Sequence, residues 1–182
     1  MLQTVVREWG GDSDLWIFGY ASLIWRPEFD FDEERFATIH GYHRALKMWS
    51  RLNRGTPERP GLVFGLLHGG SCKGMAYRIP RASVETQLPA LWDREMPNGV
   101  YDPKWLRCHT AQGQVTALAF TLSKRSPNHT GVLPDDAYRQ IFSNSCGRYG
   151  TTRDYAQLTY DKLQELGIED HALGRLLGLA SS

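Results

Sequence analysis

The chain has 182 residues, of which 21 are Lys or Arg and 20 are Asp or Glu, so its formal net charge is +1. A chain of this length can bury a core without disulfides or metal, and we expect one domain over residues 1–182. The near-neutral charge argues against nucleic acid or a membrane surface as the main partner. The three cysteines are far apart in the sequence, and residues 1–14 lack the apolar core of a signal peptide. Both features favour a reduced, cytoplasmic protein.

The stretch that begins at Trp16 reads as a short buried strand that ends in a tight bend. Gly19 allows the backbone to turn, and the small residues Ala21 and Ser22 leave successive backbone N–H groups uncovered. Donors that converge in this way can hold a carboxylate or phosphate, and the Ser22 hydroxyl adds another donor. The alternative is a strand-to-loop corner without a ligand.

The rest of the chain mixes strands with helices. Residues 36–49 predict strand on both sides of a bend at Gly41, and residues 62–67 and 75–79 predict two strands joined by a hairpin or short crossover. Two further strands are expected at 105–109 and 115–122, followed by helices that begin near Pro134, Thr151 or Thr152, and Asp170. The many short strands and bend glycines predict an α+β fold with a small curled sheet or barrel.

No metal site is expected from the two histidines nearest each other in the sequence. His40 and His43 lie three residues apart on a predicted strand, so their side chains point to opposite faces of it.

Residues 83–96 predict a helix, capped by Ser83 and stopped by Pro97, in which Glu95 falls on the apolar stripe. Desolvation and the helix C-terminus both disfavour the charge of a carboxylate there, so the pKa of Glu95 should be raised. That is the property of a general base. If the helix instead ends early or kinks at Pro89, Glu95 lies on a solvated loop. The stripe consists of Val84, Leu88, Leu91, Trp92 and Glu95.

Five stretches in order resemble the ChaC-like family of γ-glutamylcyclotransferases over nearly the whole chain. Residues 16–27 look like its WIFGYGSLxWxP signature, residues 54–61 like its RGTPxxPG loop, and residues 71–78 like its SCxGxAY strand. Residues 91–101 resemble the segment that carries the catalytic glutamate, and residues 147–155 resemble GxxGxxxEY. Ala21 stands where the signature has glycine, and alanine would be strained at a positive φ.

The resemblance implies a barrel of mixed strands flanked by helices, no cofactor and no metal, and conversion of glutathione into 5-oxoproline and cysteinylglycine. Glu95 would be the general acid/base that takes a proton from the substrate α-amino group and returns it to the leaving amine. The loop Tyr20, Ala21, Ser22 and Leu23 would bind the glutamyl α-carboxylate, and Tyr155 would hydrogen-bond in the glutamyl pocket.

Other functions remain open from the sequence. The substrate could be another γ-glutamyl peptide or amine. Ser22 could instead be an acylating nucleophile with a histidine base, although the chain lacks a GxSxG elbow there. A non-catalytic binding module would keep the anion loop but tolerate loss of Glu95.

Overall fold

The computed structural model describes residues 1–97 and 99–180. The chain divides into two compact units, each built from two segments. Unit 1 comprises Met1–His43 and His68–Thr121, and unit 2 comprises Arg44–Leu67 and Leu122–Ser182. The expectation of a single domain stays a prediction. None of the helices in the described part of the chain combines the length and apolar character needed to span a membrane.

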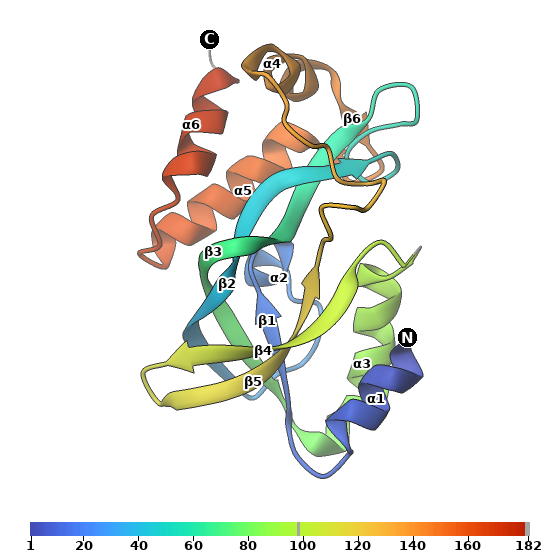
Figure 1. Cartoon of the computed structure of the whole chain (residues 1–182), viewed down its shortest axis with the longest axis vertical. Coiled ribbons are helices and arrows are strands. Elements are labelled where there is room, and N and C mark those ends of the chain that lie inside the picture. Colours follow the sequence, from blue (N-terminus) through green and yellow to red (C-terminus); the bar gives the residue numbers. More distant parts are fainter. Residues whose placement is uncertain (98, 181–182) are drawn as a thin grey trace. The chain divides into compact units, whose positions relative to one another are not determined.

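The elements follow one another along the chain as labelled in Figure 1. The helices are α1 (Leu2–Trp9), α2 (Ser22–Trp25), α3 (Arg81–Glu95), α4 (Asp135–Asn144), α5 (Thr152–Glu165) and α6 (His171–Leu179). The strands are β1 (Leu15–Gly19), β2 (Glu33–Ser50), β3 (Gly61–Ile79), β4 (Asp102–Thr110), β5 (Gly113–Thr121), β6 (Cys146–Gly147) and β7 (Gly150–Thr151).

Five of the strands close a barrel in the order β1-β3-β2-β4-β5. Strand β1 pairs antiparallel with β3, from Leu15 opposite Ile79 to Gly19 opposite Met75. It pairs parallel with β5 through Trp16 and Ile17, while β4 and β5 form an antiparallel hairpin. The sheet is therefore mixed. With the helices of Figure 1, it confirms the predicted α+β fold with a small mixed β-barrel.

Apolar side chains that alternate along these strands fill the interior of unit 1. Leu15, Ile17, Ala37 and Ile39 have exposed fractions of 0–1%. This alternation is what the period-2 geometry of a strand dictates when one face is buried. Strand β1 is paired on both sides, with β3 and β5, up to the bend that follows it.

The predicted break in β3 is wrong. Residues 68–74 continue the strand from Gly61 to Ile79 instead of forming a hairpin or crossover. Gly69 and Gly70 adopt φ values of 107° and 73°, which change the course of the strand without ending it. Gly41 does the same in β2 with a φ of 85°, as expected for the bend in that region.

Unit 2 packs helices α4, α5 and α6 against one another. Thr152, at the start of α5 and fully buried, accepts hydrogen bonds from the backbone N–H of Leu62 at 2.9 Å and from the Ser145 hydroxyl at 2.8 Å. A helix follows Asp170, as predicted, and Asp170 caps this helix, α6, by accepting a hydrogen bond from the Leu173 N–H. Its other oxygen forms a salt bridge with Arg44, whose side chain is 5% exposed.

Candidate active site

The bend after β1 is held by close contacts between backbones and aromatic rings. A Cβ atom on Gly19 would lie 3.0 Å from the Tyr77 ring and 3.2 Å from the Leu23 side chain. A Cβ atom on Gly74, in the neighbouring strand β3, would lie 2.3 Å from the carbonyl oxygen of Gly19. Position 74 therefore requires glycine, because a Cβ atom there would overlap a backbone oxygen, and at position 19 a Cβ atom would fit only if its neighbours moved by a few tenths of an ångström. The bend is a tightly packed corner.

Of the loop Tyr20–Leu23, predicted to bind the substrate carboxylate, Ser22 and Leu23 form the first two residues of the short helix α2. The Tyr20 hydroxyl donates a hydrogen bond to the Phe120 carbonyl at 2.9 Å, so this side chain anchors the loop to strand β5. Ala21 has φ −145°, a negative value that does not need glycine. The strain of a positive φ, which alanine would have suffered at this position, therefore does not arise.

The first backbone hydrogen bond of α2 runs from the Ile24 N–H to the Ala21 carbonyl at 2.9 Å. The N–H groups of Ser22 and Leu23 precede it and have no acceptor within the helix. The Leu23 side chain is buried with 4% exposure, whereas Ser22 is partly accessible. The backbone N–H groups of Ser22 and Leu23, which the sequence predicts as anion donors, thus lie next to each other at the start of α2.

Glu95 is the last residue of α3 and keeps only 13% of its side chain exposed. Burial of the carboxylate raises the pKa of Glu95 above its ordinary value; the positive charge of Arg94 opposes this rise and the negative charge of Glu28 adds to it. The helix passes through Pro89 without ending, so Glu95 does not lie on a solvated loop. It begins earlier than predicted, with Pro80 rather than Ser83 at the N-cap.

Arg94 is a candidate functional residue that the sequence pattern does not indicate, because it is not part of the apolar stripe that contains Glu95. Its guanidinium contacts Glu95 Oε1 from Nε at 3.2 Å and Glu28 Oε2 from Nη1 at 3.0 Å. Nη2 donates to the Ser22 hydroxyl oxygen at 3.4 Å. A single side chain therefore connects the predicted base with the predicted ligand loop, all within unit 1.

Ser22 lacks the surroundings of an acylating serine. Its hydroxyl oxygen accepts a hydrogen bond from Arg94, whose guanidinium stays protonated and cannot accept a proton. Within residues 1–97 and 99–180, no histidine is hydrogen-bonded to Ser22. The arrangement gives the hydrolase alternative no base.

Tyr155 lies in the first turn of α5, as predicted, and belongs to unit 2. Its hydroxyl accepts a hydrogen bond from the Phe64 N–H at 3.3 Å, and the guanidinium carbon of Arg54 lies 4.9 Å from the centre of its ring. Tyr155 is 5% exposed and Arg54 is 7% exposed. Its role in the glutamyl pocket stays a prediction.

Three glycines of the sequence motifs in unit 2 are explained by backbone crowding. A Cβ atom on Gly55 would lie 2.1 Å from the Gly61 nitrogen, and one on Gly61 would lie 2.1 Å from the Arg54 carbonyl oxygen. A Cβ atom on Gly147 would lie 2.5 Å from the Gly55 nitrogen. The RGTPxxPG loop and the later GxxG segment therefore carry glycine where main chains meet.

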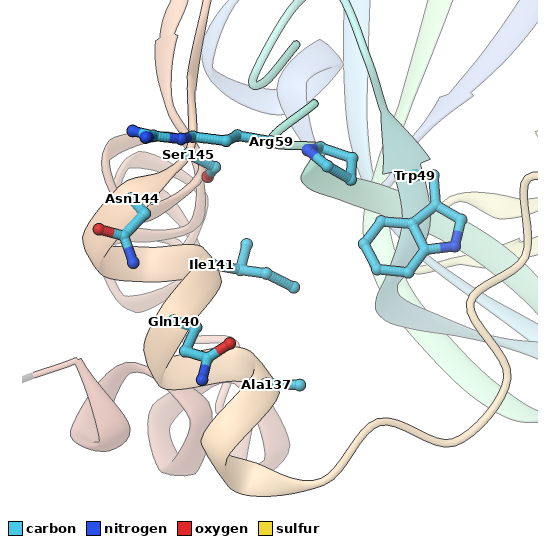
Figure 2. A pocket seen from close by; sticks show the side chains of 8 residues that line it. Trp49, Arg59, Ala137, Gln140, Ile141, Asn144 and Ser145 are labelled. Carbon is cyan, nitrogen blue, oxygen red and sulfur yellow. The ribbon is translucent and has the colours of Figure 1, made fainter. Parts of the chain in front are cut away.

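Unit 2 also contains an open pocket of about 490 Å³ beside α4. Figure 2 shows Ile141 and Ala137 pointing from this helix toward the side where Trp49 lies. None of the described residues that line it is a carboxylate, thiol or imidazole, so it offers no general base. Its lining consists of Trp49, Arg59, Pro60, Ala137, Gln140, Ile141, Asn144 and Ser145.

Among the described residues, no group of three or more His, Cys, Asp or Glu has the arrangement of a metal site.

The half-buried Glu95 carboxylate and the nearby backbone N–H donors of the loop Tyr20–Leu23 are groups that an enzyme uses for general acid–base catalysis. The chain belongs to the ChaC-like family, whose model matches residues 15–181. It is 34% identical over 167 residues to a protein of Escherichia coli named glutathione-specific gamma-glutamylcyclotransferase, with 91% of this chain and 72% of that protein covered. Gamma-glutamylcyclotransferase 2-3 of Arabidopsis thaliana is 34% identical over 168 residues, covering 86% of this chain and 83% of the relative.

The fold also matches a solved structure. A crystal structure of a γ-glutamyl cyclotransferase specific to glutathione from yeast superposes with a TM-score of 0.84. The match covers 93% of this chain and 96% of the yeast chain at 20% identity, so it establishes a shared fold.

Proposed function

We propose that this chain is a glutathione-specific γ-glutamylcyclotransferase that releases 5-oxoproline and cysteinylglycine. Its family membership and the names of its relatives from bacteria and plants support this activity. The observation that carries the proposal is the connection, within one unit, between the half-buried Glu95 carboxylate and the Ser22 hydroxyl through Arg94.

The reaction requires a base because the attacking group of the substrate is protonated at neutral pH. The α-amino nitrogen of the γ-glutamyl group must lose a proton before it can form a bond to the γ-carbonyl carbon. The bond from that carbon to the cysteine nitrogen then breaks, and the leaving amine takes up a proton. Glu95 receives the first proton and delivers it to the leaving nitrogen. The ring nitrogen loses a second proton after it bonds to the carbonyl carbon, and the released amine takes up that proton to become an ammonium group. No water is consumed, because the attacking nitrogen belongs to the substrate itself.

The loop after β1 binds and orients the substrate in this mechanism. The N–H groups of Ser22 and Leu23 bind the α-carboxylate of the glutamyl group, with the Ser22 hydroxyl beside them. Holding the carboxylate and the amino group together folds the substrate toward attack, and such positioning can contribute about 7–11 kcal/mol of barrier reduction. Tyr155 contributes a hydrogen bond in the glutamyl pocket.

Product analysis by mass spectrometry tests the reaction. The protein is incubated separately with glutathione, with γ-glutamyl dipeptides and with γ-glutamyl-lysine. Cyclisation yields 5-oxoproline, whereas hydrolysis yields free glutamate. Turnover of glutathione in preference to the other compounds supports the proposed substrate, and release of glutamate overturns the mechanism.

Replacement of Glu95 tests its role as the base. Glu95→Gln keeps the shape of the side chain and removes the base, so the rate should fall by about 10²- to 10⁴-fold while glutathione still binds. Glu85→Gln is the matched control, because Glu85 lies on the exposed side of the same helix. A loss below about tenfold in Glu95→Gln would contradict the assignment. A non-catalytic binding module would show no turnover in either protein.

A further inference from the structure

The guanidinium of Arg94 is surrounded by acceptors from two segments of unit 1. Besides Glu95 and Ser22, it donates from Nη1 to the carbonyl oxygens of Arg26 at 2.6 Å and Pro27 at 2.9 Å. All of these acceptors except Glu95 lie in α2 or directly after it. The planar fork of an arginine can serve several acceptors in fixed directions at once. The end of α3 is thereby joined to the segment that begins at the ligand loop.

We propose that Arg94 is a positioning residue: it holds the Glu95 carboxylate at a fixed position relative to Ser22 in the loop that binds the substrate carboxylate. This inference rests on the proposed function of Glu95 as the base. Arg94 acts through Glu95 and Ser22 and takes no proton itself, because a guanidinium stays charged.

Glu28 completes the arrangement. Its carboxylate contacts Arg94 and also accepts a hydrogen bond from Arg26 Nε at 2.5 Å. Glu28 has a φ of 57°, a backbone conformation that side chains other than glycine rarely adopt. Among the described residues, it is the one non-glycine with a positive φ. An unusual backbone conformation thus accompanies a carboxylate that shares Arg94 with the predicted base.

Two neighbouring charges act on the pKa of Glu95 in opposite directions, in addition to the larger effect of burial, which raises it. Arg94, the neighbour on the same helix, favours the ionised carboxylate, whereas Glu28 from the loop after α2 disfavours it. These are the charged groups that shift the titration of Glu95 in the described structure. Burial raises the pKa of Glu95 most, Arg94 opposes this rise, and Glu28 adds to it.

Two substitutions with opposite effects on the same group provide the test. Arg94→Gln removes the favourable charge, so the pKa of Glu95 should rise further. Glu28→Gln removes the unfavourable charge, so the same pKa should fall. Carbon NMR of the glutamate side chains measures both shifts without substrate, with the Glu95 signal assigned by its loss in Glu95→Gln. The acidic limb of the kcat/KM profile should move in the same directions.

Arg94→Lys separates charge from geometry. Lysine keeps the positive charge but lacks the fork, so the pKa of Glu95 should stay near its original value while kcat falls by about tenfold or more. Arg139→Gln is the control, because Arg139 forms an ion pair with Asp136 at the surface of α4. It should change neither the titration nor the rate.

Opposite shifts in Arg94→Gln and Glu28→Gln, with a lowered kcat in Arg94→Lys, support the proposal. Shifts in the same direction, no shift, or a full kcat in Arg94→Lys overturn it. If Arg94→Gln fails to fold by circular dichroism, Glu28→Gln and Arg94→Lys decide the question alone. Absence of 5-oxoproline from the unmodified protein would refute the proposed function, whereas the NMR titration would still report on the coupling of Arg94 to Glu95.

Discussion

Gly74→Ala, in the strand next to β1, should displace the loop Tyr20–Leu23 and lower the activity, although Gly74 itself is not predicted to touch substrate. The added Cβ atom would lie 2.3 Å from the Gly19 carbonyl oxygen, whereas ordinary contact begins at 3.4 Å, a shortfall of 1.1 Å. The Phe18 ring, at 3.0 Å, blocks an escape in that direction. The strand pairing between β1 and β3 resists separation, so the Gly19 carbonyl and the loop after it must move.

The size of this displacement sets the expected loss. A misplacement of about 1 Å in a site can lower the rate by about 10²-fold. Overpacking of this kind also costs about 1–3 kcal/mol of folding free energy. For a chain of this length, that corresponds to a decrease in Tm of about 2–12 °C. We therefore expect a folded but weakly active protein.

The assay compares the release of 5-oxoproline from glutathione with thermal unfolding followed by circular dichroism. Gly178→Ala serves as the control, because a Cβ atom on Gly178 in α6 would meet no atom within 4 Å. This control should keep full activity and an unchanged or slightly higher Tm. If Gly74→Ala retained the activity and Tm of the original protein, the close contact with Gly19 would not constrain the loop, and the reasoning would be refuted.

Three further outcomes follow from buried polar groups. Thr152→Val removes the acceptor of two buried hydrogen bonds and should lower the free energy of unfolding by about 2–4 kcal/mol, measured by urea denaturation. Asp170→Ala removes both a helix cap and the partner of Arg44, and should cost about 2–4 kcal/mol, whereas Asp170→Asn should cost less because it keeps the cap; equal losses would contradict this division. Glu95→Gln should raise the Tm at pH 7, because the raised pKa of Glu95 makes the folded state bind more protons than the unfolded state, so stability is lost as pH rises above about 4.5. The gain should vanish near pH 3, and a Tm difference independent of pH would refute it.

The elements that the sequence predicts well are those with a strong period or a recognisable cap. The hairpin of β4 and β5, the helix of Glu95 and the caps of α5 and α6 all have such local signals. The helix α1 and the single turn α2 were not predicted; neither begins with a side-chain cap, and α2 is only four residues long. The break placed at residues 68–74 failed because glycine signals a turn locally, while Gly74 serves a contact with Gly19 that is distant in sequence.

The site shows the same limit. The apolar stripe of α3 was sufficient to single out Glu95 as a half-buried carboxylate, since helical geometry fixes which residues share a face. Arg94 is not part of that stripe. Its contacts with Ser22 and Glu28 depend on how α3 packs against the segment after β1, which no local pattern encodes.

The division of the chain has a consequence for how the protein can be taken apart or recombined. Because the polypeptide leaves unit 1 within β2, returns within β3 and leaves again after β5, neither unit is encoded by one continuous piece of sequence. A single cut or a single genetic crossover cannot transfer either unit intact. Any successful chimaera of this protein must exchange both pieces of a unit together, across three junctions.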